Sequence, residues 1–471
     1  MTRLEIRRVT GAGLLLFCLV PVAVSQSGAC PQSPPAYKYL RADEDYSYLR
    51  NPACRTDALD ELKFIPLGAE RVSYLSFGAE IRQDMEYFNN ASWGKGPQGP
   101  AYLLQRYMGS LDLHLGSHLR LFGQFKSGLE NGRTGGPRKP IDEDKADVNQ
   151  AFVELSFSPA AKKTITLRAG RQEMAYGVAR FVSVRDGPNV HQTFDALKLI
   201  FNINKLRIDT FVSKPVQTNP EEIDDYPDPP RTFWGVYATS PLHWPGAHLD
   251  LYYFGLRNSN AKFQQGSGLE ERHSVGTRLW GSRDAWDYDV EPVFQFGSFG
   301  SSTVRAWAVE SEAGYKLRRL RYTPRVAFRP EIDSGDSNSA NPELQTFNLL
   351  FARGLYHQLV NLNGHQNAIS LAPVVTFYLS KRLTVSQDCS FIWRENTGDG
   401  LYGVGGNLLR PGAPSQARYI ATQPTSLVDW RLQRHLGVIL IYTHSFPGQF
   451  IRQSGPGRPV NYVNAWIDFK F

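Results

Sequence analysis

The sequence has little methionine and little cysteine for its length. Only 4 Met and 4 Cys occur among 471 residues, against 27 Phe, 22 Tyr and 41 Gly. That mixture argues against a helical bundle, because aromatic residues favour strands and glycine serves turns and bulges. Hydrophobic residues still make up 41% of the chain and charged residues 21%, which excludes a disordered protein. We therefore predict an all-β fold.

The sequence also lacks the motifs of common catalytic sites. It contains no His-Glu-x-x-His, no Gly-x-Ser-x-Gly and no cysteine pair with the spacing of a zinc site. We therefore predict that the protein is not an enzyme, and we expect no cofactor, no metal and no nucleic-acid partner. A hydrolase whose catalytic residues are distant in sequence is the remaining enzymatic alternative.

No apolar run after residue 24 is long enough to cross a membrane as a helix. The run 11–24 follows Arg3, Arg7 and Arg8 and ends in small residues that suit a signal peptidase. We interpret residues 1–25 as a secretory signal peptide. A membrane anchor is the less favoured alternative, because a spanning helix needs roughly 20 apolar residues. A membrane location would then require a closed β-barrel, which satisfies its backbone hydrogen bonds in lipid.

Residues 26–68 carry proline, tyrosine and charge without sustained alternation. We assign them to a periplasmic N-terminal segment ahead of the barrel, which we place at residues 69–471. We expect this segment to be a flexible stretch that precedes the barrel. Alternatively, it contacts a secretion partner or plugs the mouth of the barrel. Cys30 and Cys54 lie in it, and the sequence leaves open whether they form a disulfide or stay free.

A regular alternation of apolar and polar residues begins near residue 71. Its clearest instance places Leu75, Phe77 and Ile81 on one face and Glu80 and Arg82 on the other. In a soluble sandwich the apolar face would point to a core, whereas in a membrane barrel it would meet lipid and the polar face would line a wet lumen. Alternation alone does not separate these two interpretations.

The connections between the alternating segments favour the barrel. We count 18 such segments, an even number of the length typical of bacterial outer-membrane barrels, and short turns alternate with long loops as in those barrels. Short turns are predicted near 116–117, 159–160, 202–204, 241–246, 282–284, 318–321, 380–382 and 433–436. Long loops are predicted near 89–100, 131–147, 176–191, 215–231, 258–270, 334–364, 396–423 and 446–459. The connection near 297–302 is an exception, because it is short where the pattern predicts a long loop.

The last ten residues form a period-two segment that ends in Phe471. Such an end is similar to the C-terminal signal by which outer-membrane barrels are recognised for assembly. The fold class predicted is therefore a transmembrane antiparallel β-barrel of about 18 strands in the bacterial outer membrane.

The segment from Leu167 to Leu199 resembles the signature of the alginate export family. The resemblance is carried by Gly170, Arg171, Gln172, Glu173, Gly177, Arg180, Arg185, Asp186, Asn189, Phe194 and Asp195. A second stretch is similar to a later motif of that family, with Thr346, Phe347, Asn348, Leu350, Phe351, Arg353, Gly354 and Tyr356. The resemblance covers about Phe77–Phe471. It implies an 18-stranded barrel with an electropositive pore that passes an anionic polysaccharide out of the periplasm.

Arginine residues concentrate in this signature. Arg168 lies on the polar face of an expected strand, and three more follow into an expected long loop. Guanidinium groups pair bidentately with carboxylates and keep their charge, so a ladder of them suits the passage of a polyuronate. A salt-bridged network that merely pins the loop is the alternative, given equal weight. The predicted pore residues are Arg82, Arg168, Arg171, Arg180, Arg185 and Arg353, with positioning carboxylates Asp84, Glu173, Asp186 and Asp195.

The formal charge of +7 and the pI near 9.1 agree with an anionic substrate. We predict export of an anionic exopolysaccharide such as alginate, and a general or substrate-specific uptake porin for small anionic solutes is the alternative. Expected partners are the polysaccharide, outer-membrane lipid and lipopolysaccharide, and periplasmic secretion components. Barrels of this size are often monomers in the family it resembles, so a monomer is expected.

Overall fold

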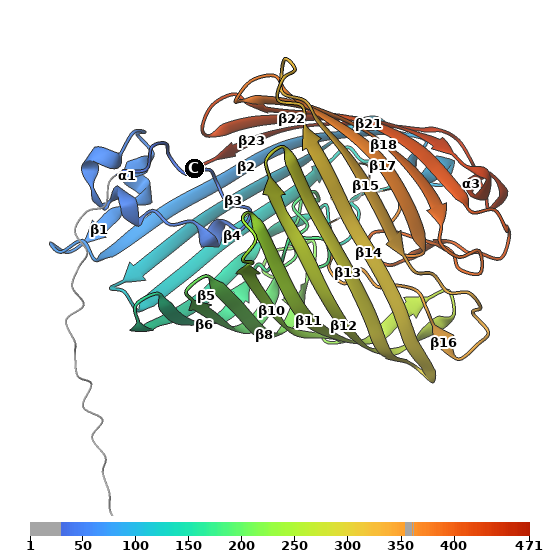
Figure 1. Ribbon diagram of the computed structural model, residues 1–471, viewed down its shortest axis with the longest axis horizontal. Helices are drawn as coiled ribbons and strands as arrows, with labels where there is room; N and C mark the ends of the chain where they lie inside the picture. Colours follow the sequence, from blue (N-terminus) through green and yellow to red (C-terminus); the bar gives the residue numbers. More distant parts are fainter. Residues whose placement is uncertain (1–29, 354–359, 361) are drawn as a thin grey trace, which may run out of the picture.

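Eighteen antiparallel strands close into a barrel in the computed structural model, which describes residues 30–353, 360 and 362–471 (Figure 1). Closure joins the first barrel strand, β2 (Ser73–Asn89), to the last, β23 (Val460–Lys470). Along this seam Ile81 lies opposite Phe469. Both the predicted fold class and the predicted strand number are confirmed. The predicted signal peptide lies outside the described residues.

The barrel strands follow one another in chain order, each paired with its neighbours in sequence. Between β2 and β23 they are β3 (Tyr102–Leu115), β4 (Leu119–Asn131), β5 (Asp144–Ala160), β6 (Lys163–Gln172), β7 (Phe194–Ile203), β8 (Leu206–Gln217), β10 (Arg231–Pro241), β11 (Ala247–Phe263), β12 (Gly266–Arg283), β13 (Trp286–Phe299), β14 (Ser302–Lys316), β15 (Arg325–Asp333), β17 (Ala368–Tyr378), β18 (Leu383–Arg394), β21 (Tyr419–Arg431) and β22 (Leu436–Pro447).

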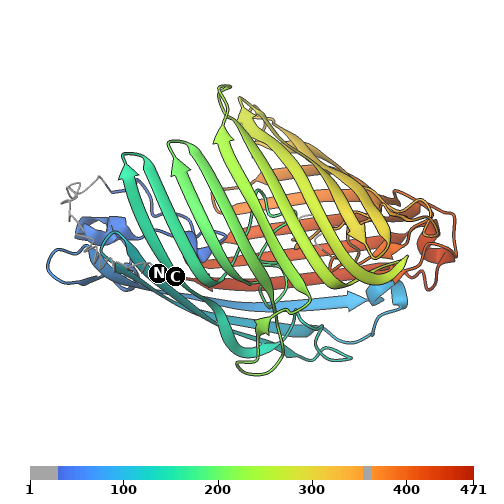
Figure 2. The same ribbon diagram turned by 90° about the horizontal axis from the view of Figure 1, so that it is seen from below.

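Short elements decorate this wall. The extra strands are β1 (Ile65–Leu67), β9 (Tyr226–Pro227), β16 (Glu343–Leu344), β19 (Leu401–Tyr402) and β20 (Leu408–Arg410), and the loop helices are η4 (Ala91–Gly94) and α3 (Gln449–Gln453). Figure 2 shows the C-terminus and the N-terminal part of the described chain, in dark blue, near the same end of the barrel. None of the helices in the described ranges has the length and apolarity that crossing a membrane requires.

Alternation along the strands sorts the side chains to two environments. Leu197, Phe294 and Leu251 point outward and are about half exposed, as expected of side chains that meet lipid. Their neighbours on the other face are buried inside the barrel, among them Lys198 and Gln295. The period-two interpretation of the sequence therefore corresponds to an outer apolar face and an inner, mainly polar one.

Most predicted connections are found, and one is wrong. We expected a long loop over residues 258–270, but β11 and β12 continue through most of it and meet at the two-residue turn 264–265. A bulge between Asn258 and Ala261 shifts which positions point inward, and Ala261 and Phe263 then pack on Phe299 and Val304 of the next strands. The polar residues near 258–260 hide this continuation in the sequence.

The N-terminal segment is ordered and docks at the end of the barrel that carries the short turns. It contains η1 (Arg41–Asp43), η2 (Ser47–Arg50), η3 (Pro52–Cys54), α1 (Asp60–Lys63) and β1, which extends the sheet along β2. Cys30 and Cys54 form a disulfide, which settles the alternative left open by the sequence. Leu49 and Phe64 are buried against Tyr74 of β2. Short turns mark the periplasmic end of such barrels, so the segment lies on the periplasmic side.

Candidate functional site: an arginine-bearing loop inside the barrel

The connection between β6 and β7, residues 173–193, folds into the barrel. Met174, Phe181 and Val182 of this loop are buried in an apolar cluster inside the barrel. The cluster continues onto the inner faces of β7 to β14 through Phe194, Phe211, Phe233, Tyr237, Tyr252, Phe254, Val293 and Ala306. The lumen is therefore apolar along this wall, where the sequence predicted a wet polar face. Packing of this kind holds the loop across the interior and fixes where its charged residues lie.

One side of the loop is clamped by two arginines of the wall. Arg82 of β2 lies directly opposite Arg106 of β3, and both point inward. Arg82 donates to the backbone oxygen of Asp186 at 2.7 Å and to its carboxylate at 3.1 Å, and Arg106 donates to the same two groups at 2.8 and 2.9 Å. Arg82 also pairs with Asp468 at 2.7 Å. One carboxylate of the loop thus bridges two neighbouring guanidinium groups, each of which has a second carboxylate partner on the wall.

Glu173, at the start of the loop, forms further contacts beside these arginines. It accepts hydrogen bonds from Asn149 at 2.9 Å, and its carboxylate lies 2.6 Å from Nδ1 of His191. The other imidazole nitrogen of His191 lies 3.2 Å from Asp186 and 2.6 Å from Arg106. The two ends of the loop are therefore linked to each other and to the wall.

Arg180 reaches the opposite wall. Its guanidinium group lies 2.6 Å from Asp289 and 2.7 Å from Glu291, both on the inner face of β13, and its side chain is fully buried. Tyr252 donates a further hydrogen bond to Glu291 at 2.9 Å. The loop therefore spans the barrel from the β2–β3 wall to the β13 wall.

Arg185 and Arg353 differ from the paired arginines. Arg185 is partly exposed, has φ 57°, and has no carboxylate partner within the described part of the chain. It lines a cavity of about 40 Å³ together with Arg231 and His191. Arg353 stacks over the ring of Tyr39, 5.2 Å from its centroid. Neither of these two arginines forms an ion pair with a carboxylate of the described residues.

The remaining predicted arginines lie on β6, one on the inner face of the barrel and one on the outer face. Arg168 is buried on the inner face of β6, where it donates to Glu154 at 2.6 Å and lies 3.5 Å from Asp43 of the N-terminal segment. Arg171 shares the outward face of β6 with Ala169 and pairs with Asp195 on β7 at 2.9 Å.

The structure therefore does not bring Arg171 and Asp195 to the lumen. Strand β6 continues to Gln172, so Arg171 still alternates to the outer face, and Asp195 lies opposite it on β7. Asp84 lies inside the barrel and accepts a hydrogen bond from Asn464 at 2.5 Å.

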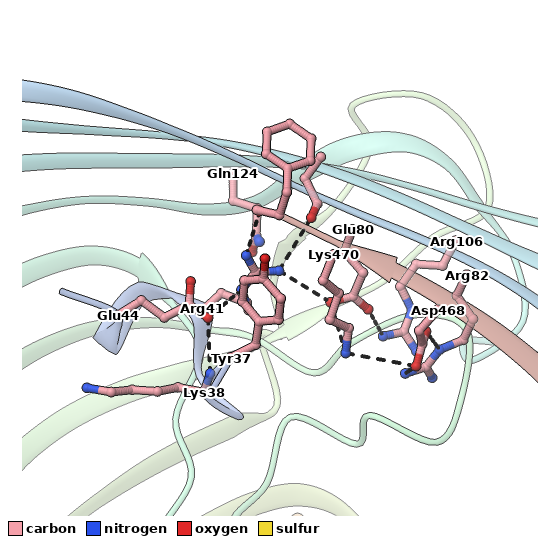
Figure 3. A network of polar contacts seen from close by, with 12 residues as sticks. Tyr37, Lys38, Arg41, Glu44, Glu80, Arg82, Arg106, Gln124, Asp468 and Lys470 are labelled. Carbon is pink, nitrogen blue, oxygen red and sulfur yellow. Dashed lines mark hydrogen bonds and ion pairs between the residues drawn. The ribbon is translucent and has the colours of Figure 1, made fainter. Parts of the chain in front are cut away.

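The N-terminal segment reaches the same region from the periplasmic side (Figure 3). Arg41 donates to Glu44 at 2.8 Å and to the backbone oxygen of Phe471 at 2.8 Å, and it lies 4.0 Å from Glu80. Glu80 pairs with Arg106 at 3.1 Å. A continuous set of ion pairs thus joins the segment to the arginines that hold the loop.

Further contacts seat the segment inside the periplasmic mouth. The backbone oxygen of Ala42 accepts a hydrogen bond from Arg120 at 2.7 Å, and Ala42 packs on Phe122 and Phe152 of the inner wall. On its outer side a cavity of about 600 Å³ opens, lined in part by Asp43, Glu44 and Arg207. The segment therefore occupies part of the channel mouth.

Sequence reasoning missed several members of this network: Arg41, Arg106, His191, Asp289 and Glu291. Arg106 and Glu291 alternate onto the inner faces of β3 and β13. The alternation of apolar and polar residues in the sequence could therefore have identified both. No pattern in the sequence indicated that Arg41 or His191 enters the barrel, because loops and termini carry no periodicity.

Comparisons with known proteins agree with this architecture. The family model described as "Alginate export" matches residues 73–465. No curated protein sequence matches the chain. The solved structures of OccK2 (OpdF) from Pseudomonas aeruginosa and of a BenF-like porin from Pseudomonas fluorescens are similar, at 11% and 10% identity and a TM-score of 0.56 each. Both comparisons cover 84% of this chain, and 97% and 99% of the other chain respectively.

A structure of Pseudomonas aeruginosa OpdK with vanillate is also similar, with 10% identity, a TM-score of 0.53, and coverage of 84% of this chain and 98% of that one. At these identities the three structures indicate a shared porin fold. The family model extends over most of the barrel, from β2 to β23. The chain therefore belongs to the alginate export family, as a channel-type β-barrel of the bacterial outer membrane.

Proposed function

We propose that the protein exports an anionic polysaccharide, such as alginate, from the periplasm through this barrel. The observation that carries the proposal is the loop 173–193, which lies across the lumen and presents Arg185 without an internal carboxylate partner among the described residues. A polyuronate carries one carboxylate on each sugar, and a guanidinium group binds a carboxylate in two parallel hydrogen bonds. The family to which the chain belongs supports the same direction and substrate class.

The ion pairs around the loop suit a site that both binds and releases. Arg82, Arg106 and Arg180 are each held by protein carboxylates, so a substrate carboxylate would exchange with Asp186 or Asp289. Conduction requires sites that bind well enough for entry and weakly enough for exit. The protein's own carboxylates lower the attraction between these arginines and the substrate. We propose that Arg185 and Arg353 make the first contacts with the substrate.

Passage of a polymer requires that the loop and the N-terminal segment move aside. At the β2–β3 wall both are held in part by charged pairs, which a polyanion can replace. We propose that the incoming chain displaces Asp186 from Arg82 and Arg106 and so releases the loop. A periplasmic secretion component that contacts the N-terminal segment would supply the polymer, and we propose that the barrel works as a monomer in contact with lipid and lipopolysaccharide.

Planar-bilayer recording tests the proposal directly. We expect an anion-selective conductance that added oligouronates block and neutral oligosaccharides of equal length do not. The variant Arg185→Ala should weaken the block by roughly 10-fold, since a charge-assisted hydrogen bond contributes about 1.5–3 kcal/mol. Arg171→Ala is the matched control, because it removes an arginine of the same signature from the outer face. A pore indifferent to uronates would contradict the proposal.

An uptake porin for small anionic solutes is the second candidate. It is favoured by the likeness of the fold to OpdK, whose structure holds vanillate, a small carboxylate. The cavity beside Arg185, at about 40 Å³, also suits a small group better than a polymer. Block by monomeric uronate or vanillate as strong as that by long oligouronates would favour this candidate.

A further inference from the structure

A group of exposed basic side chains lies at the periplasmic end of the barrel, where the short turns are. It is carried by the turn 317–324 between β14 and β15, by the turn 379–382 between β17 and β18, and by the end of β14. We call this group the basic rim, and its members are Lys316, Arg318, Arg319, Arg321, Lys381 and Arg382. None of them forms an ion pair with a carboxylate of the described residues.

Hydrogen bonds to the backbone bring neighbouring turns together at the basic rim. The amide of Tyr378, at the end of β17, donates to the backbone oxygen of Tyr322 at 3.1 Å. The guanidinium group of Arg318 donates to the backbone oxygen of Asp284, in the turn between β12 and β13. Asp284 supplies the one carboxylate of these three turns. The basic rim therefore gives this end of the barrel a strong local positive charge.

Exposed aromatic and apolar side chains lie beside the basic rim on the outer face. Trp286 of β13 lies directly opposite Tyr315 of β14, with ring centroids 4.8 Å apart, and the two are 58% and 38% exposed. Leu320 is 56% exposed, and the guanidinium group of Arg321 lies 4.6 Å from the ring centroid of Tyr322. Tryptophan and tyrosine concentrate where a membrane meets water. The basic rim therefore lies at the level of the lipid headgroups.

The lumen side of the same strands carries its charges in pairs. Arg325, at the start of β15, pairs with Glu312 of β14 at 2.6 Å and also with Asp287 of β13. These charges offset one another within the channel wall, so the net charge of this region is carried by the basic rim. A polyanion in the lumen would meet the paired groups, whereas lipid headgroups around the barrel would meet the basic rim.

We propose that the basic rim binds the headgroups of anionic phospholipids in the membrane leaflet at the periplasmic end. Clustered lysine and arginine attract anionic lipids, and each cation near the surface strengthens the binding roughly 5-fold. The apolar stems of these side chains can lie along the neighbouring aromatic rings while their charged ends meet phosphate groups. This binding does not depend on the solute that passes through the channel.

Native mass spectrometry of the full-length folded protein tests the proposal. With phosphatidylglycerol and phosphatidylcholine of equal chain length, we expect adducts of phosphatidylglycerol at a lipid concentration at least about 10-fold lower. A triple variant, Arg318→Gln with Arg319→Gln and Arg321→Gln, should lose most of this preference. The backbone hydrogen bond from Leu317 to Pro324, at 2.8 Å, closes the turn without these exposed side chains, so the variant should fold.

A second triple variant removes the same amount of charge at the other end of the barrel. Lys145→Gln, Arg257→Gln and Arg305→Gln each change an exposed cation that already has a carboxylate partner, so the lipid preference should stay at the wild-type value. The proposal is overturned if the wild-type protein binds both lipids equally, or if the two triple variants lose the preference equally.

An oligouronate provides a further comparison. If it binds the wild-type protein more tightly than phosphatidylglycerol does, and only the first triple variant loses that binding, the proposal is overturned and the basic rim belongs to the path of the transported polymer. The comparison of the two lipids on the wild-type protein decides the matter even where a variant fails to fold.

Discussion

Arg82 and Arg106 lie directly opposite each other on β2 and β3, and both guanidinium groups bind the carboxylate of Asp186. Two cations at this spacing repel each other, so the loop residue between them is needed for the wall as well as for the loop. The pair is therefore the point at which the loop can be released with the smallest chemical change.

Asp186→Asn should open the channel. The neutral amide removes the charge that the two opposed arginines share, so the attachment of residues 173–193 on this side is weakened to the hydrogen bonds with backbone oxygens. We expect single-channel conductance several-fold above the wild type, measured in a planar bilayer. Asp195→Asn is the matched control, because Asp195 pairs with Arg171 on the outer face, and its conductance should equal that of the wild type. Equal conductance of both variants would rule out this role for Asp186.

Arg180→Met should destabilise the folded barrel. Removing the guanidinium group leaves Glu291 buried with Tyr252 as its one hydrogen-bond donor among the described residues, and breaking a buried pair costs about 3–5 kcal/mol. Urea unfolding followed by tryptophan fluorescence measures the change. Arg257→Met is the comparison, since Arg257 and Glu271 form an exposed pair at 3.2 Å that contributes less than about 1 kcal/mol. A cost for Arg180→Met as small as that of the comparison variant would contradict the inferred role.

Arg41→Ala should loosen the N-terminal segment. The variant loses the hydrogen bonds to Glu44 and to the backbone of Phe471, so the segment leaves the mouth more often. We expect faster proteolysis within residues 38–64 and a higher conductance. Arg257→Ala is the control, because Arg257 forms only an exposed pair with Glu271 on β12, away from the segment. Unchanged proteolysis of Arg41→Ala would show that other contacts hold the segment.

Lys63 should make the stability of the docked segment depend on pH. Burial, with a smaller effect of the Arg41 charge, lowers the pKa of Lys63 to about 7 from 10.5. Its ammonium group lies over the rings of Tyr46 and Phe471, at 4.7 and 5.3 Å from their centroids. Between these two pH values the unfolded chain holds a proton that the folded chain has lost, so the free energy of unfolding rises with pH.

Each unit of pKa difference corresponds to about 1.4 kcal/mol of this rise. Lys63→Met removes the titrating group and should flatten the curve between pH 7 and 10.5, the same window. Urea unfolding of both proteins at several pH values measures the two slopes. Parallel curves for the wild type and Lys63→Met would show that Lys63 titrates normally in the folded protein.

The barrel was predictable from the sequence because the alternation of apolar and polar residues is visible within each strand by itself. Alternation assigns a side chain to lipid or lumen, and it placed Arg82 and Arg168 inside correctly. The strands could also be counted one by one, because the hydrocarbon thickness gives each apolar face a similar length. The same rule places Arg171 and Asp195 outside once the true end of β6 is known, which the sequence did not show.

The interior contents were not predictable in the same way. Whether residues 173–193 enter the barrel depends on Phe181 finding Phe347 and Phe194, residues that are distant in the sequence. The ordered position of Arg41 depends on the barrel mouth, which no local pattern describes. Contacts between a loop and a distant wall are set by the closed fold, so they become visible only with the structure.

One hydrogen-bond acceptor of Arg41 is in position only when the barrel is closed. Its guanidinium group donates to the backbone oxygen of Phe471, and Phe471 exchanges hydrogen bonds with Ala79 across the seam between β23 and β2. Until the last strand has met the first, that acceptor is not in place. The contact of Arg41 with Phe471 therefore forms only after the last strand is in place, although Arg41 belongs to the part of the chain that is made first.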